Sequence, residues 1–237
     1  MHFVNENIEW LKSSAELHLL PTIWFRNTWS WGCTSEGCTF KPKIALREKN
    51  LLQLIHETLG EYHLRFGPDS KGISPPVLFT ENETNNQRLY DAPNVSSYVK
   101  DGFHSYVIEG NREAVNPKQS GTKAAPHFQL RLGPGGKQCI RFRLASGKAT
   151  ESESMDREFE RLISQRIRES DAFYASVLPK GISPETRNVA RQAYAGLLWT
   201  KQFYQYIVKE WLEGDPNMPS LPESRRAGRN SEWMHLH

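Results

Sequence analysis

The first two thirds of the chain alternate apolar and polar residues with a period of two, which predicts β-strands. The clearest case is segment 127–132 (HFQLRL) followed by segment 138–144 (QCIRFRL), with the turn sequence GPGGK between them. A glycine-rich turn between two alternating runs predicts a β-hairpin. Further strands are expected at 51–56, 62–66, 77–80 and 103–109. Loops rich in Gly, Pro, Asn and Asp separate these segments, as in a β-sandwich.

The period changes to about 3.6 residues after the polar linker 146–154, which predicts an amphipathic helix over 155–174. A second helix is expected to begin at Ser183-Pro184-Glu185, where an N-cap residue precedes a proline and an acid. Its apolar pattern continues to Gly214, which would make the helix about 45 Å long at 1.5 Å per residue. The remaining residues, rich in proline and arginine, are predicted to be extended. The pattern therefore predicts an α+β fold.

The composition argues against two classes of protein, those that bind nucleic acid and those that span a membrane. The chain has 237 residues, and its 30 Lys and Arg against 27 Asp and Glu give a net charge of +3. The basic residues are scattered, so no nucleic-acid partner is expected. There is no signal-like N-terminus and no apolar run of about 18 residues, so we expect a cytoplasmic protein without a membrane partner.

Three cysteines leave one alternative open. The pair Cys33 and Cys38 could bind zinc if His18 or His56 completed the site, but there is no second pair with metal-ligand spacing. A reduced cytosolic set is the favoured interpretation, with no metal and no cofactor expected.

The segment 21–32 (PTIWFRNTWSWG) carries three tryptophans, an arginine and an asparagine. Tryptophan faces stack on the C–H faces of sugar rings, and the polar groups of Arg and Asn suit sugar hydroxyls. A carbohydrate site is therefore one hypothesis. Packing in a core or a domain contact is the other, and composition alone favours it.

A series of longer motifs runs along the chain in a fixed order, beginning with PTIWFRNTWSWG and ending near the C-terminal residue. The others are FTENETN (79–85), SSYVKDGFHSYVIEG (96–110), AVNP (114–117), GTKAA (121–125), ESDAFY (169–174), RQAYAGLLWTKQFYQY (191–206), EWLEGDP (210–216) and GRNSEWMHL (228–236). In these motifs and their order the chain resembles glycoside hydrolase family 63, in the branch of large bacterial and fungal relatives of the processing glucosidases.

The resemblance implies a fold and a division into domains. It implies that 1–148 is part of a β-sandwich domain, that 149–213 holds the first helices of an (α/α)6 barrel, and that 214–237 is an extended tail. It also implies an inverting pair of carboxylates in the barrel, both beyond His237. No catalytic residue is therefore expected in this chain, which resembles a family member truncated at both ends.

The resemblance assigns substrate-binding residues to the helical part of the chain. They are Trp199, Lys201, Gln202, Tyr206, Asn230 and Trp233. Ile207 stands where the family pattern has an aspartate, and an aliphatic side chain cannot accept a hydrogen bond from a sugar hydroxyl.

The acids and the histidine of the first domain are open to a structural interpretation. The resemblance places Glu81 and Glu83 in the β-domain, where we expect them to fix loops. Tyr98, Lys100, Asp101, His104 and Tyr106 would form a hydrogen-bonding cluster or a solvated hairpin end. His104 has no nucleophile beside it in a recognisable pattern, so triad chemistry is not expected.

Three hypotheses about function follow. The first is a fragment of an inverting glycoside hydrolase acting on α-linked oligosaccharides, inactive alone. The second is a non-catalytic carbohydrate- or partner-binding module, and the third is an enzyme completed by a separate barrel remainder. The expected partners are an oligosaccharide and either a second copy of the chain or that remainder.

Overall fold

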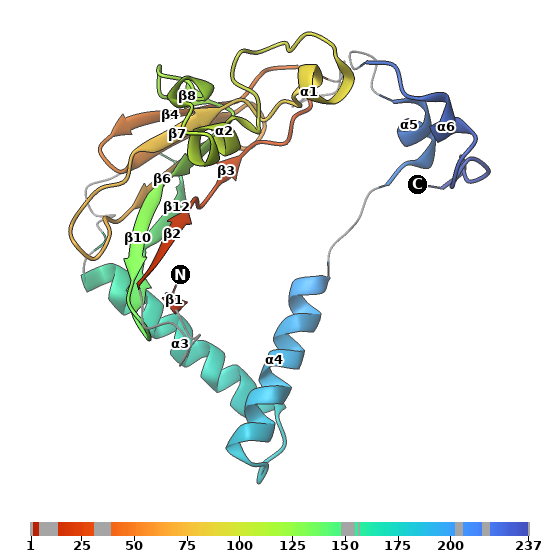
Figure 1. The fold of residues 1–237 in the computed structure, drawn as a ribbon. Helices are drawn as coiled ribbons and strands as arrows, with labels where there is room; N and C mark the ends of the chain where they lie inside the picture. Colours follow the sequence, from red (N-terminus) through yellow and green to blue (C-terminus); the bar gives the residue numbers. More distant parts are fainter. Residues whose placement is uncertain are drawn as a thin grey trace. The chain divides into compact units, whose positions relative to one another are not determined.

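The computed structural model describes residues 14–30, 39–147, 155, 157–201, 206–214 and 219–236, and the backbone of residues 2–4 (Figure 1). The chain divides into two compact units. The first, here the β-unit, comprises Met1–Glu151 and Gly214–Leu221. The second, here the helical unit, comprises Ser152–Glu213 and Pro222–His237. The fold is α+β, with several antiparallel sheets and a few helices.

The strands described in the β-unit form four antiparallel sheets. One sheet has five strands in the order β12-β6-β5-β4-β8, and another has three in the order β3-β9-β7. Two strand pairs, β1 with β11 and β2 with β10, complete the set. The strand bounds are β1 His2–Val4, β2 Ala15–Leu19, β3 Ile23–Trp24, β4 Lys43–Glu48, β5 Leu51–His56, β6 Gly60–Phe66, β7 Val77–Thr80, β8 Ser120–Gly121, β9 Lys123–Pro126, β10 Phe128–Leu132, β11 Lys137–Cys139 and β12 Phe142–Ser146.

The centre of the larger sheet is a meander of β4, β5 and β6, joined by two tight turns. Asn50 and Gly60 adopt positive φ in these turns, a conformation that asparagine and glycine accept most readily. In the resulting register Leu52 pairs with Leu64 across β5 and β6. The predicted strands at 51–56, 62–66 and 77–80 are confirmed.

One hydrophobic core joins residues from several sheets. Its members are Ile44, Leu52, Leu54, Leu64, Phe66, Phe79, Ala124, Phe128, Leu130 and Ile140. Because β4 to β6 contribute from one sheet, and β7, β9 and β10 from the others, burial of this cluster holds the sheets together. The β-unit therefore has a core of its own.

The hairpin predicted for 127–144 is wrong. The turn itself forms, with the Gly136 amide donating to the Gly133 carbonyl at 2.9 Å, but β10 and β11 do not pair. Instead β10 pairs with β2, placing Leu130 opposite Leu17, while β12 pairs with β6. Partners distant in sequence bury the apolar side of β10, and the local turn signal does not determine the pairing.

The strand predicted for 103–109 is also wrong, because helix α2 (Gly102–Ile108) occupies that segment. Phe103, Tyr106 and Val107 contact a second apolar cluster formed by Leu78 and Ala125, with the three-to-four-residue spacing of a helix. Two other short helical segments lie nearby, α1 (Asn86–Tyr90) and the 3-10 turn η1 (Arg112–Ala114).

The helical unit contains α3 (Arg157–Val177), α4 (Pro184–Thr200), α5 (Val208–Glu213) and α6 (Glu223–Arg226). The predicted helix over 155–174 is confirmed. The start of α4 is also confirmed, since the Ser183 hydroxyl caps the helix by accepting from the Thr186 amide at 3.1 Å. Arg191 on α4 forms an ion pair with Asp171 on α3, and its guanidinium lies 4.8 Å from the centre of the Tyr174 ring.

The single long helix predicted for 184–213 is wrong. Helix α4 ends at Thr200 after 17 residues, about 25 Å at 1.5 Å per residue. Helix α5 is separate, and its Val208 amide donates to the Leu236 carbonyl at 3.2 Å. The tail also differs from the extended segment that its prolines predict, because α6 and several turns lie within it. Within the described residues, no helix is long and apolar enough to cross a bilayer.

Candidate functional site

Several of the sequence motifs come together where β3, β7 and β9 end. The Phe25 amide donates to the Thr122 carbonyl at 3.0 Å, and the Glu81 amide donates to the Tyr98 carbonyl at 2.8 Å. The Lys100 amide likewise donates to the Glu83 carbonyl at 3.0 Å. Segments that are separate motifs in the sequence are therefore parts of one site.

Two carboxylates share one lysine at this place. Glu83 Oε1 accepts from Trp29 Nε1 and from Lys41 Nζ, each at 2.8 Å. Glu81 Oε2 accepts from Thr122 Oγ1 at 2.7 Å and lies 3.3 Å from the same Lys41 Nζ. We call these five residues the Glu81–Glu83 cluster. With two acids and one base it carries a net negative charge.

One atom of the cluster has no hydrogen-bond partner. Glu83 is only 4% exposed, and its Oε2 is buried without a partner among the described residues. Buried carboxylate oxygens normally accept hydrogen bonds, and an unpaired one is destabilising. Trp29, by contrast, is half-buried.

Asparagines from the same motifs hold the loops in place. The Asn82 amide donates to Thr122 Oγ1 at 2.7 Å, and its side chain donates to the Phe25 carbonyl at 2.9 Å. Asn27 is buried, and its Oδ1 accepts from the Ser30 amide at 3.3 Å. Both asparagines therefore shape the backbone, and Asn27 does not present its amide to a ligand.

Two motif glycines allow backbone segments to approach closely. A Cβ atom on Gly121 would lie 2.3 Å from the Thr80 carbonyl oxygen, and one on Gly102 would lie 2.3 Å from the Ala114 carbonyl oxygen. Neither contact is sterically allowed. The glycines of GTKAA and SSYVKDGFH therefore have a packing role beside the cluster.

A second polar network lies next to the cluster around Asp101. Its carboxylate accepts from Asn85 Nδ2 at 3.1 and 3.2 Å and from Arg88 Nη1 at 3.3 Å. The expected grouping of Tyr98, Lys100, Asp101, His104 and Tyr106 is only partly present, since His104 is exposed on α2 and Tyr106 lies against His127.

Lys123 borders both networks and has an unusual environment. Its Nζ donates to the Lys100 carbonyl at 2.7 Å and lies 4.4 Å from the centre of the Phe103 ring. Burial, and then the charge of Lys100, lower the pKa of Lys123, while Asp101 acts in the opposite direction.

The structure places the expected substrate-binding residues in and after α4. Trp199 is 81% exposed, Lys201 is exposed, and Gln202 lies outside the described residues. Asn230 Nδ2 lies 3.4 Å from the Tyr206 hydroxyl, so these two side chains are brought together. The Trp233 ring stacks on His235 at a centroid distance of 5.9 Å. Their role in binding stays a prediction.

The zinc alternative stays a prediction, because Cys33 and Cys38 lie outside the described residues. His18 contacts His127 and Glu16, and the His56 ring accepts from the Thr58 amide. Cys33 and Cys38 lie outside the described residues, and Cys139 is exposed. Within the described ranges no group of three potential metal ligands is present.

Sequence reasoning identified Trp29, Glu81 and Glu83 but did not single out Lys41 or Thr122. Lys41 sits in an ordinary Lys-Pro-Lys sequence, and only the fold brings it between the two acids. As a whole, the cluster offers carboxylate acceptors beside a partly exposed indole. That combination can accept hydrogen bonds from hydroxyl or N–H groups next to an apolar ring surface.

The chain resembles one protein among the curated sequences at high similarity. It is 35% identical over 254 aligned residues to an uncharacterized protein of Saccharomyces cerevisiae, YMR196W. The alignment covers 94% of this chain but 23% of the yeast protein, so the chain spans less than a quarter of that relative's length. No family model and no solved structure matches.

Proposed function

We propose that the chain is part of an inverting glycoside hydrolase, similar to family 63, that acts on α-linked oligosaccharides. In this proposal the sheets of the β-unit are a β-sandwich domain, and α3 and α4 are the first helices of an (α/α)6 barrel. The observation that carries it is the convergence of PTIWFRNTWSWG and FTENETN on the Glu81–Glu83 cluster. Tryptophan supplies an apolar ring surface and carboxylates supply hydrogen-bond acceptors, and a sugar needs both.

The cluster is suited to bind a sugar. Glu83 accepts from Trp29 and Lys41, and Glu81 accepts from Thr122 and forms an ion pair with Lys41, so in this proposal both carboxylates bind and neither delivers a proton to a leaving group. Glu83 Oε2 has no partner among the described residues but is buried, so the carboxylate must turn before a sugar hydroxyl can supply the missing hydrogen bond. Glu83 is therefore a binding residue in this proposal, and the acid and base of the reaction lie elsewhere in the full enzyme.

The yeast relative makes a direct test feasible. A chimera would carry this chain in place of the aligned region of the yeast protein, and hydrolysis of α-linked glucose oligosaccharides would be followed by NMR of the released anomer. We expect inversion of the anomeric configuration. Complete lack of hydrolysis by both the yeast protein and the chimera would contradict the proposal.

Two variants of the chimera test the role of the cluster. Glu83→Gln keeps the side-chain shape but removes the charge. We expect kcat/KM to fall by about tenfold, because the loss of one charge-assisted hydrogen bond has an effect of about this size. Glu48→Gln is the matched control, because Glu48 is an exposed acid on β4. Equal activity of the two variants would mean that the cluster has only a structural role.

The runner-up proposal is a carbohydrate- or partner-binding module without turnover. The half-buried Trp29 favours it, because an aromatic surface beside acceptors binds sugar whether or not a catalytic site is near. Oligosaccharide binding by the isolated chain, lost in Trp29→Ala, together with an inactive chimera, would favour this module over the hydrolase.

A further inference from the structure

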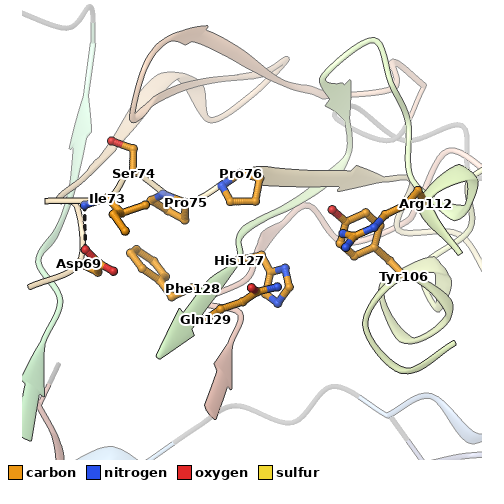
Figure 2. Close-up of a pocket in the computed structure, with 10 residues that line it drawn as sticks. All are labelled: Asp69, Ile73, Ser74, Pro75, Pro76, Tyr106, Arg112, His127, Phe128 and Gln129. Carbon is orange, nitrogen blue, oxygen red and sulfur yellow. Dashed lines mark hydrogen bonds between the residues drawn. The ribbon is translucent and has the colours of Figure 1, made fainter. Parts of the chain in front are cut away.

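A separate pocket of about 350 Å³ lies in the β-unit, lined by the segment before β7, by α2 and η1, and by the start of β10. Its walls include Pro75, Pro76 and Phe128, which are apolar, and Tyr106 (Figure 2). None of its lining residues belongs to the Glu81–Glu83 cluster. Its volume is within the usual range for small-molecule sites.

Arg112 places a cation at one end of this pocket. The Arg112 guanidinium lies 4.4 Å from the centre of the Tyr106 ring, which orients its plane. No ion pair joins Arg112 to a carboxylate within the described part of the chain. An oriented guanidinium with unused donors is suited to a planar or tetrahedral oxyanion, which it can bind through two parallel hydrogen bonds.

His127 forms the adjacent wall and contacts His18 through a ring nitrogen. Its Nε2 lies 2.8 Å from His18 Nδ1, and His18 Nε2 lies 3.2 Å from Glu16 Oε1. If His18 donates to Glu16, then His127 must donate to His18, and this leaves His127 Nδ1 as an acceptor. That atom is buried and has no hydrogen-bond partner among the described residues. In that tautomer His127 adds no second positive charge and provides an acceptor in the same pocket as Arg112.

The opposite end of the pocket is acidic. Figure 2 shows Asp69 and Arg112 on opposite sides, with Pro75, Pro76 and His127 between them. Asp69 Oδ1 accepts from the backbone amides of Lys71 and Ile73, at 2.9 and 2.8 Å, which fixes the carboxylate. The pocket therefore has a cation at one end and acceptors along the rest of its length.

We propose that this pocket binds a small hydroxylated oxyanion, such as a sugar phosphate or a sugar acid. The oxyanion pairs with Arg112, the C–H surface of the ligand lies on the prolines and Tyr106, and its hydroxyls donate toward Asp69. Burial of His127 Nδ1 means that its ring must turn slightly to accept a ligand hydroxyl. The site is distinct from the Glu81–Glu83 cluster and does not depend on hydrolase activity.

The test is isothermal titration calorimetry on the purified chain. The probes are glucose 6-phosphate, glucuronate, inorganic phosphate and glucose. We expect saturable binding of at least one of the two hydroxylated anions, weaker binding of inorganic phosphate, and none of glucose at the same concentration. Glucose 6-phosphate and glucuronate together distinguish a phosphate ester from a carboxylate as the preferred oxyanion.

Three variants and one control make the assignment specific. Arg112→Gln should weaken binding of the preferred anion by about tenfold or more, and Arg112→Lys by less, because lysine keeps the charge but not the paired donors. Asp69→Asn keeps an acceptor for both backbone amides. It should weaken binding of the hydroxylated anion and leave binding of inorganic phosphate unchanged. Arg161→Gln, an exposed arginine on α3, is the control for net charge.

Several outcomes would overturn the proposal. One is the absence of saturable binding of either hydroxylated anion at millimolar concentration. Another is binding of glucose as tight as that of the anions. The third is an equal loss of anion affinity in the Arg112 and Arg161 variants. Arg112 is exposed on a short 3-10 turn, so its variants should fold, and an unchanged melting temperature confirms this for each protein tested.

Discussion

The β-unit and the helical unit differ in where their apolar side chains lie. In the β-unit, residues such as Phe79, Leu52 and Ile44 have no exposed surface at all. In the helical unit, Leu197 is 66% exposed and Trp199 is 81% exposed, and only a few residues such as Tyr174 and Leu212 are buried. The comparison shows that the β-unit has its own core, whereas the described helices bury few of their apolar side chains.

Buried polar groups follow the same division. Within the described residues every buried polar or charged side chain belongs to the β-unit, and these are Asn27, His63, Thr80, Glu83, Asn86, Thr122 and His127. Burying such groups lowers stability unless they are bonded, so their presence marks where the fold supports specific chemistry. Both sites proposed above lie in this unit.

The largest expected difference between an interior and a surface position comes from a core phenylalanine. Phe79→Ala should lower the free energy of unfolding by about 3–5 kcal/mol, because it removes a fully buried ring and leaves a cavity. Phe40→Ala, at a side chain that is 69% exposed, is the matched control and should change it by less than about 1 kcal/mol. Urea denaturation measures both. A similar loss in the two variants would mean that the β-unit does not form the core described.

Replacing one glycine in each unit with alanine should change the free energy of unfolding by less, and with opposite sign in the two units. Gly121→Ala should destabilise by about 1–3 kcal/mol, since its Cβ would lie 2.3 Å from a backbone oxygen of Thr80. Gly196→Ala should stabilise α4 by about 0.5–1 kcal/mol, because nothing lies within 4 Å of its added Cβ and alanine favours a helix. Thermal melts of the two variants give the comparison. Destabilisation by Gly196→Ala would show that the helix packs against something at this position.

The sequence predicted the elements whose pattern is local. Strands at 51–56 and 77–80 and the helix from residue 157 follow from periodicity within a few residues, and each is present. The pairing of β10 with β2 could not be predicted, because it joins segments more than 100 residues apart while a strong turn signal points to a neighbouring strand. The prediction of a strand at the α2 segment was wrong for a related reason. The contacts of this segment with Leu78 and Ala125, which are distant in sequence, decide between helix and strand.

The candidate sites show the same limit. Trp29 and the two glutamates could be selected by residue type, and the structure joins them through Lys41, which no motif marks. The pocket at Arg112 was missed entirely. Its parts come from α2, η1, β10 and the segment before β7, and their sequence carries no recognisable signature.

The β-unit should also become less stable at mildly acidic pH, through His127. Burial, then His18 and then Arg112, lower the pKa of His127 in the folded state. The unfolded chain then takes up a proton that the folded chain does not. Stability is therefore complete above the ordinary histidine pKa of about 6.5 and is lost as the pH falls below it.

The check is the pH dependence of unfolding between pH 5 and 8, compared with two variants. His127→Asn should flatten the slope below the ordinary histidine pKa, and His104→Asn, an exposed histidine on α2, should leave it unchanged. An identical slope in wild type and His127→Asn would remove His127 as the cause.

The smallest effect on folding, and the one most specific to the helical unit, is expected from its exposed side chains. The double change Leu197→Glu and Trp199→Glu should alter the free energy of unfolding by less than about 1 kcal/mol, because both residues are mostly exposed. It should nevertheless reduce self-association, since apolar surface in water favours a second copy when no other partner is present. Sedimentation velocity over a range of concentrations measures this.

Trp24→Glu, at a side chain that is 54% exposed in the β-unit, is the control and should leave association unchanged. A wild-type chain that is monomeric at all concentrations would show that the helical unit covers its own apolar surface, and the contrast between the two units would then disappear.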